Sequence, residues 1–470
     1  MTSKPDLTTT AGRLEDLRNR LDEAQAPVGQ DAVDAVHAAG SATARERVEQ
    51  LLDSGTFVET DALARHRVEA YKMYRTKPAT DGVVTGYGLI QGQRVFVFSQ
   101  DATIFGGAIG EVYAEKVLKL YELATKTGVP VVGIYDSAGP RYQEGIVTAH
   151  MQAKILRAVS QASGLVPQIA IVAGDTSSIA ATTIPVADFI IQVEGASVDA
   201  EAHLTTATDT EAIEQARAVL GFLPQNNLAA SPLGQADGGN GADGPDLDVF
   251  MPDNDDEAYD MRDVVNAVTD GDFLELGAEQ GGSVLTGFAH VAGRAVGVVA
   301  TQPKVTGGKL SADAGRKAAR FIRTCDAFNV PVLQFVDCPG FADDQALSGA
   351  AALAYAFAEA QVGIITVITR KAFGEAYMVL GSKGLGADLV FAWPTAQIAL
   401  SDAATAAEAI GTDTAEYEAE NLNPYVATER GLVDAVVEPS HTRRHVLEGL
   451  RLLERKVVYP PVKKHGNIPL

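Results

Sequence analysis

A hydroxyl-rich stretch, AGDTSSIAATTIPVADF at residues 173–189, lies between the apolar runs QIAIV and FIIQV. Two kinds of chemistry fit such a stretch. A serine could act as a nucleophile, or the backbone could stabilise an anion. A strand that turns into a helix points several N–H groups, and the positive end of the helix dipole, at one place. Negative charge that develops there is stabilised, whether it belongs to a phosphate or to a thioester enolate.

The rest of the chain offers little support for a nucleophile or a metal. The eight histidines are scattered and show no close His, Cys or Asp spacing typical of zinc. Cys325 and Cys338 are the only cysteines, so there is no disulfide framework, and we expect both to be reduced core residues. The hydroxyls of residues 173–189 are therefore predicted to be local hydrogen-bonding and packing groups.

An internal duplication shows which elements position this stretch. DGVVTGYGLIQGQRVFVFSQDATIFGG (81–107) is echoed by GGSVLTGFAHVAGRAVGVVATQPKVTGG (281–308). The register holds without a gap, at a spacing of 201 residues, through the pairs Thr85 and Thr286, Gly106 and Gly307, Lys116 and Lys317, Val129 and Val330, Asp136 and Asp337. Chance alternation does not keep such a register, so we infer a duplicated domain.

Each copy predicts the same order of elements: a β-hairpin, a glycine turn, a helix and a short buried strand. In the first copy the helix is predicted over 111–128 and the strand over 131–135, and two copies predict two anion-stabilising turns facing each other. We expect a helical leader (1–55), an N-terminal domain (56–230), a Gly- and Asp-rich linker (231–248) and a C-terminal domain (249–470).

Composition narrows the class of protein. The 470 residues are 46% hydrophobic, which suffices for two domains that each bury a core. The formal net charge of −23 argues against nucleic acid as a partner. No apolar run is long enough to span a bilayer and the first residues do not resemble a signal peptide, so a cytoplasmic location is expected.

Several motifs resemble the carboxyltransferase β subunits of biotin-dependent acyl-CoA carboxylases, with the actinobacterial propionyl-CoA and acetyl-CoA carboxylases as the most similar type. The resemblance runs from about residue 11 to the C-terminus. It is carried by DGVVTGYG, VFSQDATIFGGAIGEVYAEK, QASGLVPQIA, FLPQNNL, KAARFIRTCDAFNVPVL, GSKGLGAD, AWPTAQIA, NPYVATERGLVDAVVEP and PPVKKHGNIPL. It implies an α/β fold of two tandem crotonase-like ββα-superhelix domains, in agreement with the duplication.

The resemblance also implies a reaction. In that family a carboxyl group moves from carboxybiotin, carried on a separate α subunit, to the α-carbon of an acyl-CoA. The acyl-CoA binds mainly to the N-terminal domain and biotin to the C-terminal domain of another subunit within a hexamer. Two Gly-Gly oxyanion holes hold the thioester enolate and the ureido oxygen of biotin. No covalently bound cofactor and no metal are implied.

Three departures fall on the predicted site. The first Gly-Gly pair corresponds to Ser178-Ile179, where Cβ atoms would crowd the thioester. The second corresponds to Gly374-Glu375, where a carboxylate would repel a developing oxyanion unless it turns away. In the turn DSAGPR, at 136–141, Pro140 removes one N–H donor.

Other parts of the predicted acyl-CoA side are kept. Gly106, Gly107 and Gly139 are expected near the substrate, and Arg141 is expected to hold an acyl-CoA phosphate or an ion pair. Two family segments that line the sites are missing, one after FIIQV and one after VDCPGF. The scaffold motifs match well while the chemical positions differ, which suggests selection for shape and assembly.

Three hypotheses follow for function. In the first, the chain is a catalytically impaired or structural β-type subunit that assembles with an intact β paralogue, a biotinylated α subunit and acyl-CoA, in fatty-acid or mycolate-type lipid metabolism. In the second, it is a free-standing crotonase-like enzyme, a decarboxylase or a hydratase, for which Glu144 and Glu375 are the available carboxylates. In the third, it is purely structural.

Overall fold

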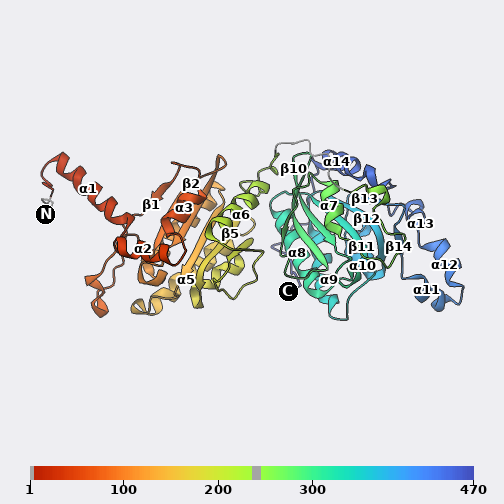
Figure 1. Cartoon of the computed structure of the whole chain (residues 1–470), viewed down its shortest axis with the longest axis horizontal. Coiled ribbons are helices and arrows are strands. Elements are labelled where there is room, and N and C mark those ends of the chain that lie inside the picture. Colours follow the sequence, from red (N-terminus) through yellow and green to blue (C-terminus); the bar gives the residue numbers. More distant parts are fainter. Residues whose placement is uncertain (1–4, 235–244, 470) are drawn as a thin grey trace. The chain divides into compact units, whose positions relative to one another are not determined.

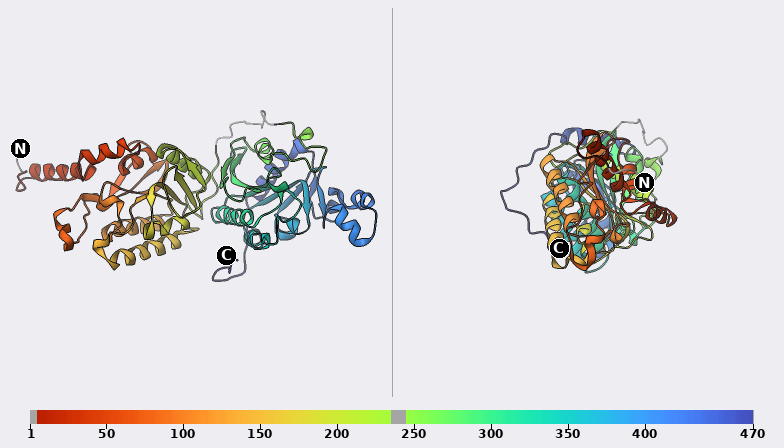
Figure 2. Two further views of the ribbon diagram at one scale, coloured as in Figure 1. Left: turned by 60° about the horizontal axis from the view of Figure 1, so that its bottom comes forward. Right: turned by 90° about the vertical axis from the view of Figure 1, so that its left-hand side faces the viewer.

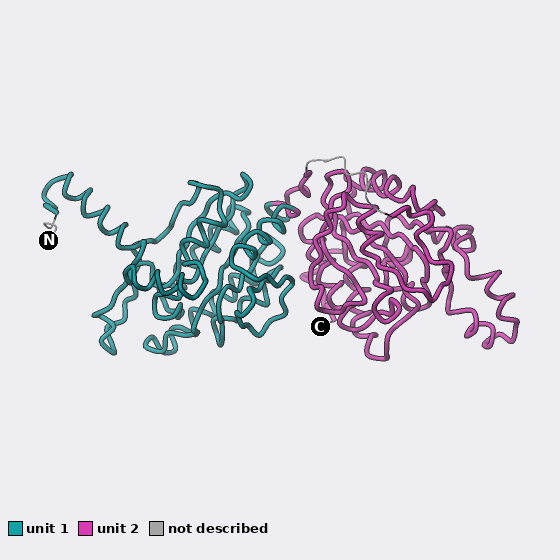
Figure 3. The backbone as a smooth tube through the Cα atoms, viewed as in Figure 1, with its two compact units in different colours: residues 1–221, 225–227 teal, residues 222–224, 228–470 magenta. Residues whose placement is uncertain are grey.

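The computed structural model describes residues 5–234 and 245–469 and divides into two compact units (Figures 1 and 3). Unit 1 contains residues 1–221 and 225–227, and unit 2 contains residues 222–224 and 228–470. The predicted helical leader belongs to unit 1. Residues 235–244 of the predicted linker lie outside the described residues, and the other predicted domain boundaries stay predictions.

Unit 1 is built on a seven-stranded sheet whose strands lie in chain order, antiparallel from β1 to β3 and parallel from β3 to β7. The strands are β1 (Val58–Thr60), β2 (Val83–Ile90), β3 (Gln93–Gln100), β4 (Val131–Ser137), β5 (Gln168–Thr176), β6 (Phe189–Val193) and β7 (Leu204–Thr206). The helices are α1 (Thr10–Gln25), α2 (Gln30–Ala38), α3 (Ala44–Leu51), α4 (Glu111–Thr127), α5 (Ile146–Ala162) and α6 (Asp209–Phe222).

The core of unit 1 lies between the sheet and the helices α4 and α5. Its buried side chains include Phe98 and Tyr135 from the sheet with Leu120 and Ile155 from the helices. Helix α4 begins at Glu111 after Gly110 and ends at Gly128 in the left-handed conformation, a common C-terminal cap. Short 3₁₀ turns connect these elements: η1 (Ala70–Arg75), η2 (Ala79–Gly82), η3 (Phe105–Gly107), η4 (Tyr142–Glu144) and η5 (Ser178–Val186).

Unit 2 repeats the plan with an eight-stranded sheet in the order β15-β13-β12-β11-β10-β9-β8, to which β14 adds beside β12. Its strands are β8 (Leu274–Leu276), β9 (Val284–Val291), β10 (Arg294–Thr301), β11 (Val332–Cys338), β12 (Ile364–Phe373), β13 (Leu389–Ala392), β14 (Gln397–Ala399) and β15 (Ala435–Val436). Its helices are α7 (Met261–Val268), α8 (Ala312–Ala327), α9 (Ala346–Glu359), α10 (Gly374–Val379), α11 (Ala403–Ile410), α12 (Thr414–Asn421), α13 (Pro424–Glu429) and α14 (Thr442–Leu453), with the 3₁₀ turns η6 (Leu247–Val249), η7 (Thr306–Gly308), η8 (Lys383–Leu385) and η9 (Pro439–His441).

Helices cover both faces of the second sheet. On one face, α7 and α14 pack against the sheet through apolar side chains such as Val264 and Leu450. On the other face, α8 packs against β10 and against α9, which it approaches closely where Gly315 meets the backbone of Gly349. Figure 2 gives two further views of the sheets and the helices that cover them. Among the described residues, no helix has both the length and the apolar character needed to cross a membrane.

The predicted duplication is confirmed strand by strand. Thr85 pairs with Phe98 across the first hairpin, and Thr286 pairs with Val299 across the second. The predicted α/β fold of two repeated units is therefore confirmed.

A buried lysine occupies the same place in both units. Lys116 on α4 donates to the carbonyls of Thr80 (2.9 Å) and Val83 (2.5 Å). Lys317 on α8 donates to the carbonyls of Gly277 (3.1 Å) and Gln280 (2.7 Å). Burial lowers the pKa of each from 10.5 to about 8. Each lysine thus fixes the segment that leads into its hairpin. Burying its charged ammonium group costs free energy, which is why its pKa is lowered.

This cost predicts that the contribution of Lys317 to the stability of unit 2 grows as the pH rises from about 8 to about 10.5. In that window the unfolded Lys317 is still protonated while the folded one is neutral, so this residue adds about 1.4 kcal/mol per pH unit to the free energy of unfolding. Burial raises the pKa of the Cys325 and Cys338 thiols, which act in the opposite direction above about pH 9, so the contribution of Lys317 is measured as the difference between the wild type and a variant. The fluorescence of Trp393, which is fully buried in unit 2, would follow urea unfolding.

Lys317→Met should lower the slope of the free energy of unfolding against pH by about 1.4 kcal/mol per pH unit relative to the wild type. Lys304→Met should keep the wild-type slope, because the Lys304 side chain is 56% exposed. An equal pH slope for the wild type and Lys317→Met would contradict the assignment.

Candidate active-site crevices

Two candidate sites lie beyond the carboxyl ends of neighbouring parallel strands, one in each unit, and we call these two positions the first and the second crevice. In unit 1 the strands are β4 and β5, whose last residues Ser137 and Thr176 pair with each other. In unit 2 they are β11 and β12, where Cys338 pairs with Ala372. Both pairings shift register just before this point. In open α/β sheets, ligands bind in such crevices beyond the strand ends.

The chain leaves β5 and β12 in the same way. Ser178 begins η5 with φ = 57°, and Gly374 begins α10 with φ = 48°. The first N–H groups of a helix have no partner within it. The N–H groups of Ser178, Ile179, Gly374 and Glu375 are therefore available to a ligand, and no hydrogen bond to them is recorded within the described residues.

The side chains at the first crevice differ from the expectation in one respect. Ile179 is half-buried and packs against the apolar core of unit 1, so its branched side chain does not fill the crevice. Ser178 is exposed, and its Cβ would lie 3.7 Å from a Cβ placed on Gly139. Ser178 therefore faces the DSAGPR turn, and its side chain narrows the first crevice.

The turn at the second crevice is packed more tightly than the first. A Cβ on Gly374 would lie 2.8 Å from the carbonyl oxygen of Leu400, so only glycine fits there without a shift. Glu375 is exposed, and it forms no ion pair within the described part of the chain. Its carboxylate lies one residue beyond Gly374, at the mouth of the turn.

Gly106 and Gly107 have a structural reason for their identity. Both have positive φ, 65° and 69°, in the turn η3. A Cβ on Gly107 would collide with the carbonyl oxygen of Asp136, and a Cβ on Gly308 would collide with that of Asp337. The glycine turn thus packs backbone against backbone on the end of β4 or β11. This contact supports one wall of each crevice.

Arg141 forms the ion pair that was one of its two expected roles. Its guanidinium is 2% exposed and donates to Asp81 (2.7 Å), to Glu144 (2.9 Å) and to the carbonyl of Ala108 (3.0 Å). Burial raises the pKa of Asp81, although Arg141 opposes this. The guanidinium is committed to these partners, so in this conformation it does not present itself to a phosphate.

The same cluster occupies Glu144. Its carboxylate accepts from Arg141 and from the backbone N–H of Glu111 (2.5 Å). Only 3% of its side chain is exposed. Glu144 lies in unit 1 and Glu375 in unit 2. A hydratase would need two carboxylates free to meet the thioester, and Glu144 is not free.

Arg47, which the sequence did not single out, extends this network. It is buried and donates to Asp136 (3.0 Å) at the end of β4 and to Asp209 (2.9 Å) at the start of α6. The leader therefore supports the turn beside the first crevice. No local signal identifies this role, because its partners lie 89 and 162 residues away.

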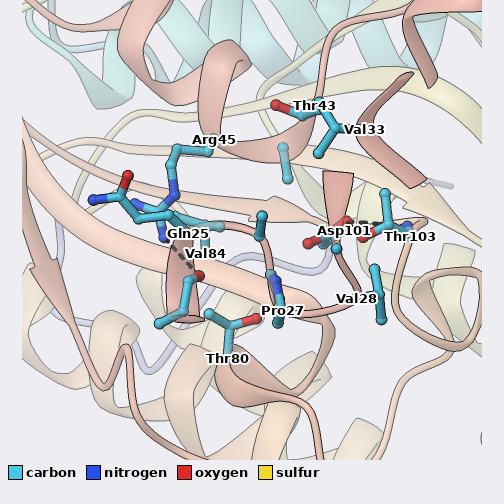
Figure 4. Close-up of a pocket in the computed structure, with 14 residues that line it drawn as sticks. Gln25, Pro27, Val28, Val33, Thr43, Arg45, Thr80, Val84, Asp101 and Thr103 are labelled. Carbon is cyan, nitrogen blue, oxygen red and sulfur yellow. Dashed lines mark hydrogen bonds between the residues drawn. The ribbon is translucent and has the colours of Figure 1, made fainter. Parts of the chain in front are cut away.

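A separate cavity in unit 1 lies between the α1–α2 connection and the sheet (Figure 4). Its lining includes Val28, Arg45, Thr80 and Asp101, and burial raises the pKa of Asp101. None of the predicted site residues lines it. Within residues 5–234 and 245–469, no group of three His, Cys, Asp or Glu side chains is placed to hold a metal ion.

Comparisons with known proteins agree with this geometry. A carboxyl transferase domain model matches residues 35–199 and 197–468. The chain is 43% identical to the biotin-dependent acetyl-/propionyl-coenzyme A carboxylase beta5 subunit of Mycobacterium tuberculosis, over 99% of the chain and 96% of that protein. It is 44% identical to the propionyl-CoA carboxylase beta chain of Saccharopolyspora erythraea, over 99% of the chain and 97% of that protein.

A solved structure, the transcarboxylase 12S with hydrolysed methylmalonyl-coenzyme A bound, superimposes with a TM-score of 0.94 at 37% identity. It covers 98% of this chain and 99% of the other. The alignment with the Mycobacterium tuberculosis subunit spans 528 positions, more than the 470 residues present here. The chain therefore lacks segments that this relative has.

The left-handed backbone at Ser178 predicts that Ser178→Gly stabilises unit 1. An L-residue in this conformation costs roughly 1 kcal/mol, which glycine avoids, so the local free energy of opening should rise by about 0.5–1 kcal/mol. Hydrogen exchange of the core amides of β4 and β5 would measure it.

The matched control is Ser177→Gly, because Ser177 is also exposed but has extended backbone with φ = −131°. It should destabilise unit 1 slightly through the entropy of glycine. If both glycine variants changed exchange in the same direction, Ser178 would not be strained.

Proposed function

Because the chain belongs to the carboxyl transferase family, as a β-type subunit of the acyl-CoA carboxylases, we propose that it takes part in moving a carboxyl group from carboxybiotin to the α-carbon of an acyl-CoA. The acyl-CoA would bind at the first crevice and biotin at the second. Biotin would arrive on a separate α subunit, and nothing would be bound covalently to this chain.

The observation that carries the proposal is the shared left-handed turn at Ser178 and Gly374. Loss of a proton from the α-carbon places negative charge on the thioester oxygen, and the N–H groups of Ser178 and Ile179 would stabilise it. The N–H groups of Gly374 and Glu375 would stabilise charge on the ureido oxygen. A missing donor of this kind costs about 3 kcal/mol of barrier.

We further propose that this subunit is catalytically impaired. The Ser178 side chain narrows the first crevice opposite Gly139, and Pro140 cannot donate from the facing turn. The carboxylate of Glu375 would disfavour negative charge at the second crevice. An intact β-type paralogue in the same assembly would supply faster sites, and this chain would complete the complex.

Two observations support a cytoplasmic assembly. The transcarboxylase 12S, whose fold this chain shares, is a hexamer, which makes a hexamer with other β-type subunits a reasonable expectation for this chain. Cys325 and Cys338 are both free and buried, as expected in a reducing compartment.

Reconstitution with a biotinylated α subunit tests the proposal. The wild-type chain alone should transfer carboxyl groups to propionyl-CoA slowly. Ser178→Gly with Glu375→Gly should raise kcat by about tenfold or more, because the first change removes the side chain that narrows the first crevice and the second removes a carboxylate beside the developing charge. Ser163→Gly, an exposed position that precedes the opposite end of β5, should leave kcat unchanged.

Calorimetric titration with propionyl-CoA separates the alternatives. Binding of the thioester without turnover supports an impaired subunit. No heat for either the wild type or the variant with Ser178→Gly and Glu375→Gly would overturn the proposal in favour of a purely structural role. Full activity of the wild-type homo-oligomer would overturn the impairment.

A further inference from the structure

A strongly acidic projection extends from unit 2, formed by residues 402–429 on α11, α12 and α13 (Figure 1). We call it the acidic arm. It contains no Lys or Arg, and its carboxylates are Asp402, Glu408, Asp413, Glu416, Glu418, Glu420 and Glu429. All seven residues are exposed. None has a cationic partner within the described part of the chain.

The acidic arm is poorly anchored and partly apolar. Helix α12 buries none of its residues. Ile410 is 68% exposed and Tyr425 is 56% exposed, and Leu400 beside the arm is 83% exposed. Like charges repel one another and exposed apolar groups remain hydrated. The exposed side chains of the acidic arm therefore add little to the stability of unit 2. Both features indicate a surface that another protein covers.

A basic loop in unit 1 has the complementary character. We define it as residues 62–77, which contain one acid, Glu69, and the five bases Arg65, Arg67, Lys72, Arg75 and Lys77. Lys72 and Arg75 are exposed and have no carboxylate partner within the described residues. Tyr71 is 79% exposed and Tyr74 is 51% exposed.

The basic loop is held in position. His66 is buried and its Nε2 lies 2.7 Å from the carbonyl oxygen of Thr76, which closes the loop. Met73 is buried beneath it, while Tyr71 and Lys72 have positive φ and turn outwards. A loop that is already ordered loses little conformational entropy on binding, so the basic loop can serve as a docking element.

We propose that the basic loop of one copy docks on the acidic arm of a second copy. The pairing places two cations that have no carboxylate partner, and two exposed tyrosines, against seven carboxylates that have no cationic partner and against exposed apolar side chains. It rests on the assembly of β-type subunits under the proposed function, and it assigns to that assembly a contact made by named residues.

A second basic segment lies near the C-terminus. Arg443 pairs with Asp270, Lys456 with Asp388 and Lys463 with Glu359. Arg444, Arg455 and Lys464 have no ion pair within the described residues. A cross-link to the acidic arm from Lys464 instead of Lys72 would therefore overturn the choice of the basic loop.

Cross-linking tests the contact directly. Equal amounts of isotopically heavy and ordinary chain are mixed at high salt, returned to low salt and treated with a zero-length carbodiimide. Peptides that join Lys72 to a carboxylate of the acidic arm should be found with mixed isotope labels. Cross-links found only within one isotope label would place the contact inside a single chain, and absent cross-links would exclude it. Either result overturns the proposal.

Charge reversal supplies a second test, read by sedimentation at low salt. Lys72→Glu/Arg75→Glu and Glu418→Lys/Glu420→Lys should each weaken self-association by about tenfold or more. Mixing the two variants should restore it, because the reversed loop meets the reversed arm while the unchanged loop meets the unchanged arm. Failure of the mixture to associate would overturn the proposal.

The matched controls are Lys154→Glu and Glu279→Lys, which reverse exposed charges elsewhere and should not weaken association. Propionyl-CoA titration of the same variants keeps this inference separate from the proposed function. Loss of thioester binding in Lys72→Glu/Arg75→Glu, with association unchanged, would show that the loop serves a phosphate and would overturn the docking proposal.

Discussion

The close contact between a glycine turn and the end of a parallel strand organises both units. Gly107 meets the backbone of Asp136, and Gly308 meets that of Asp337, at distances that leave no room for a Cβ. This contact holds the hairpin side of the sheet against the strands that end at the crevice. The helix that follows, α4 or α8, then starts beside the strand end and carries the buried lysine that fixes the segment before the hairpin.

Much of this could be predicted from the sequence because the duplication keeps its register. The match of Thr85 with Thr286 and of Asp136 with Asp337 fixes the hairpin, the helix and the strand in both units. The positions of the turns after β5 and β12 could be predicted from the sequence, but their backbone conformation could not. Serine rarely adopts a left-handed backbone, so the residue type of Ser178 does not predict this turn, yet Ser178 has φ = 57°.

The ion pairs around the first crevice could not be predicted from the sequence, for a different reason. Arg141 lies between Asp81 and Glu144, and Arg47 joins Asp136 to Asp209. These pairs connect residues far apart in the chain, and a single sequence contains no signal for them. Once buried, each guanidinium needs its carboxylates, because an unpaired charge in the interior is strongly destabilising. The arginines are thus tied to the scaffold that carries the turn.

The two crevices differ in how far a side chain can be tolerated. At Gly374 the carbonyl of Leu400 excludes a Cβ, so replacement there would displace the backbone and with it the N–H groups. At Ser178 the space opposite Gly139 admits a small side chain, and at the next position Ile179 finds room in the core. Glu375 is exposed to solvent, where a charged group costs little. Side chains larger than glycine thus stand where the fold has room for them, and the backbone forms a left-handed turn at both Ser178 and Gly374.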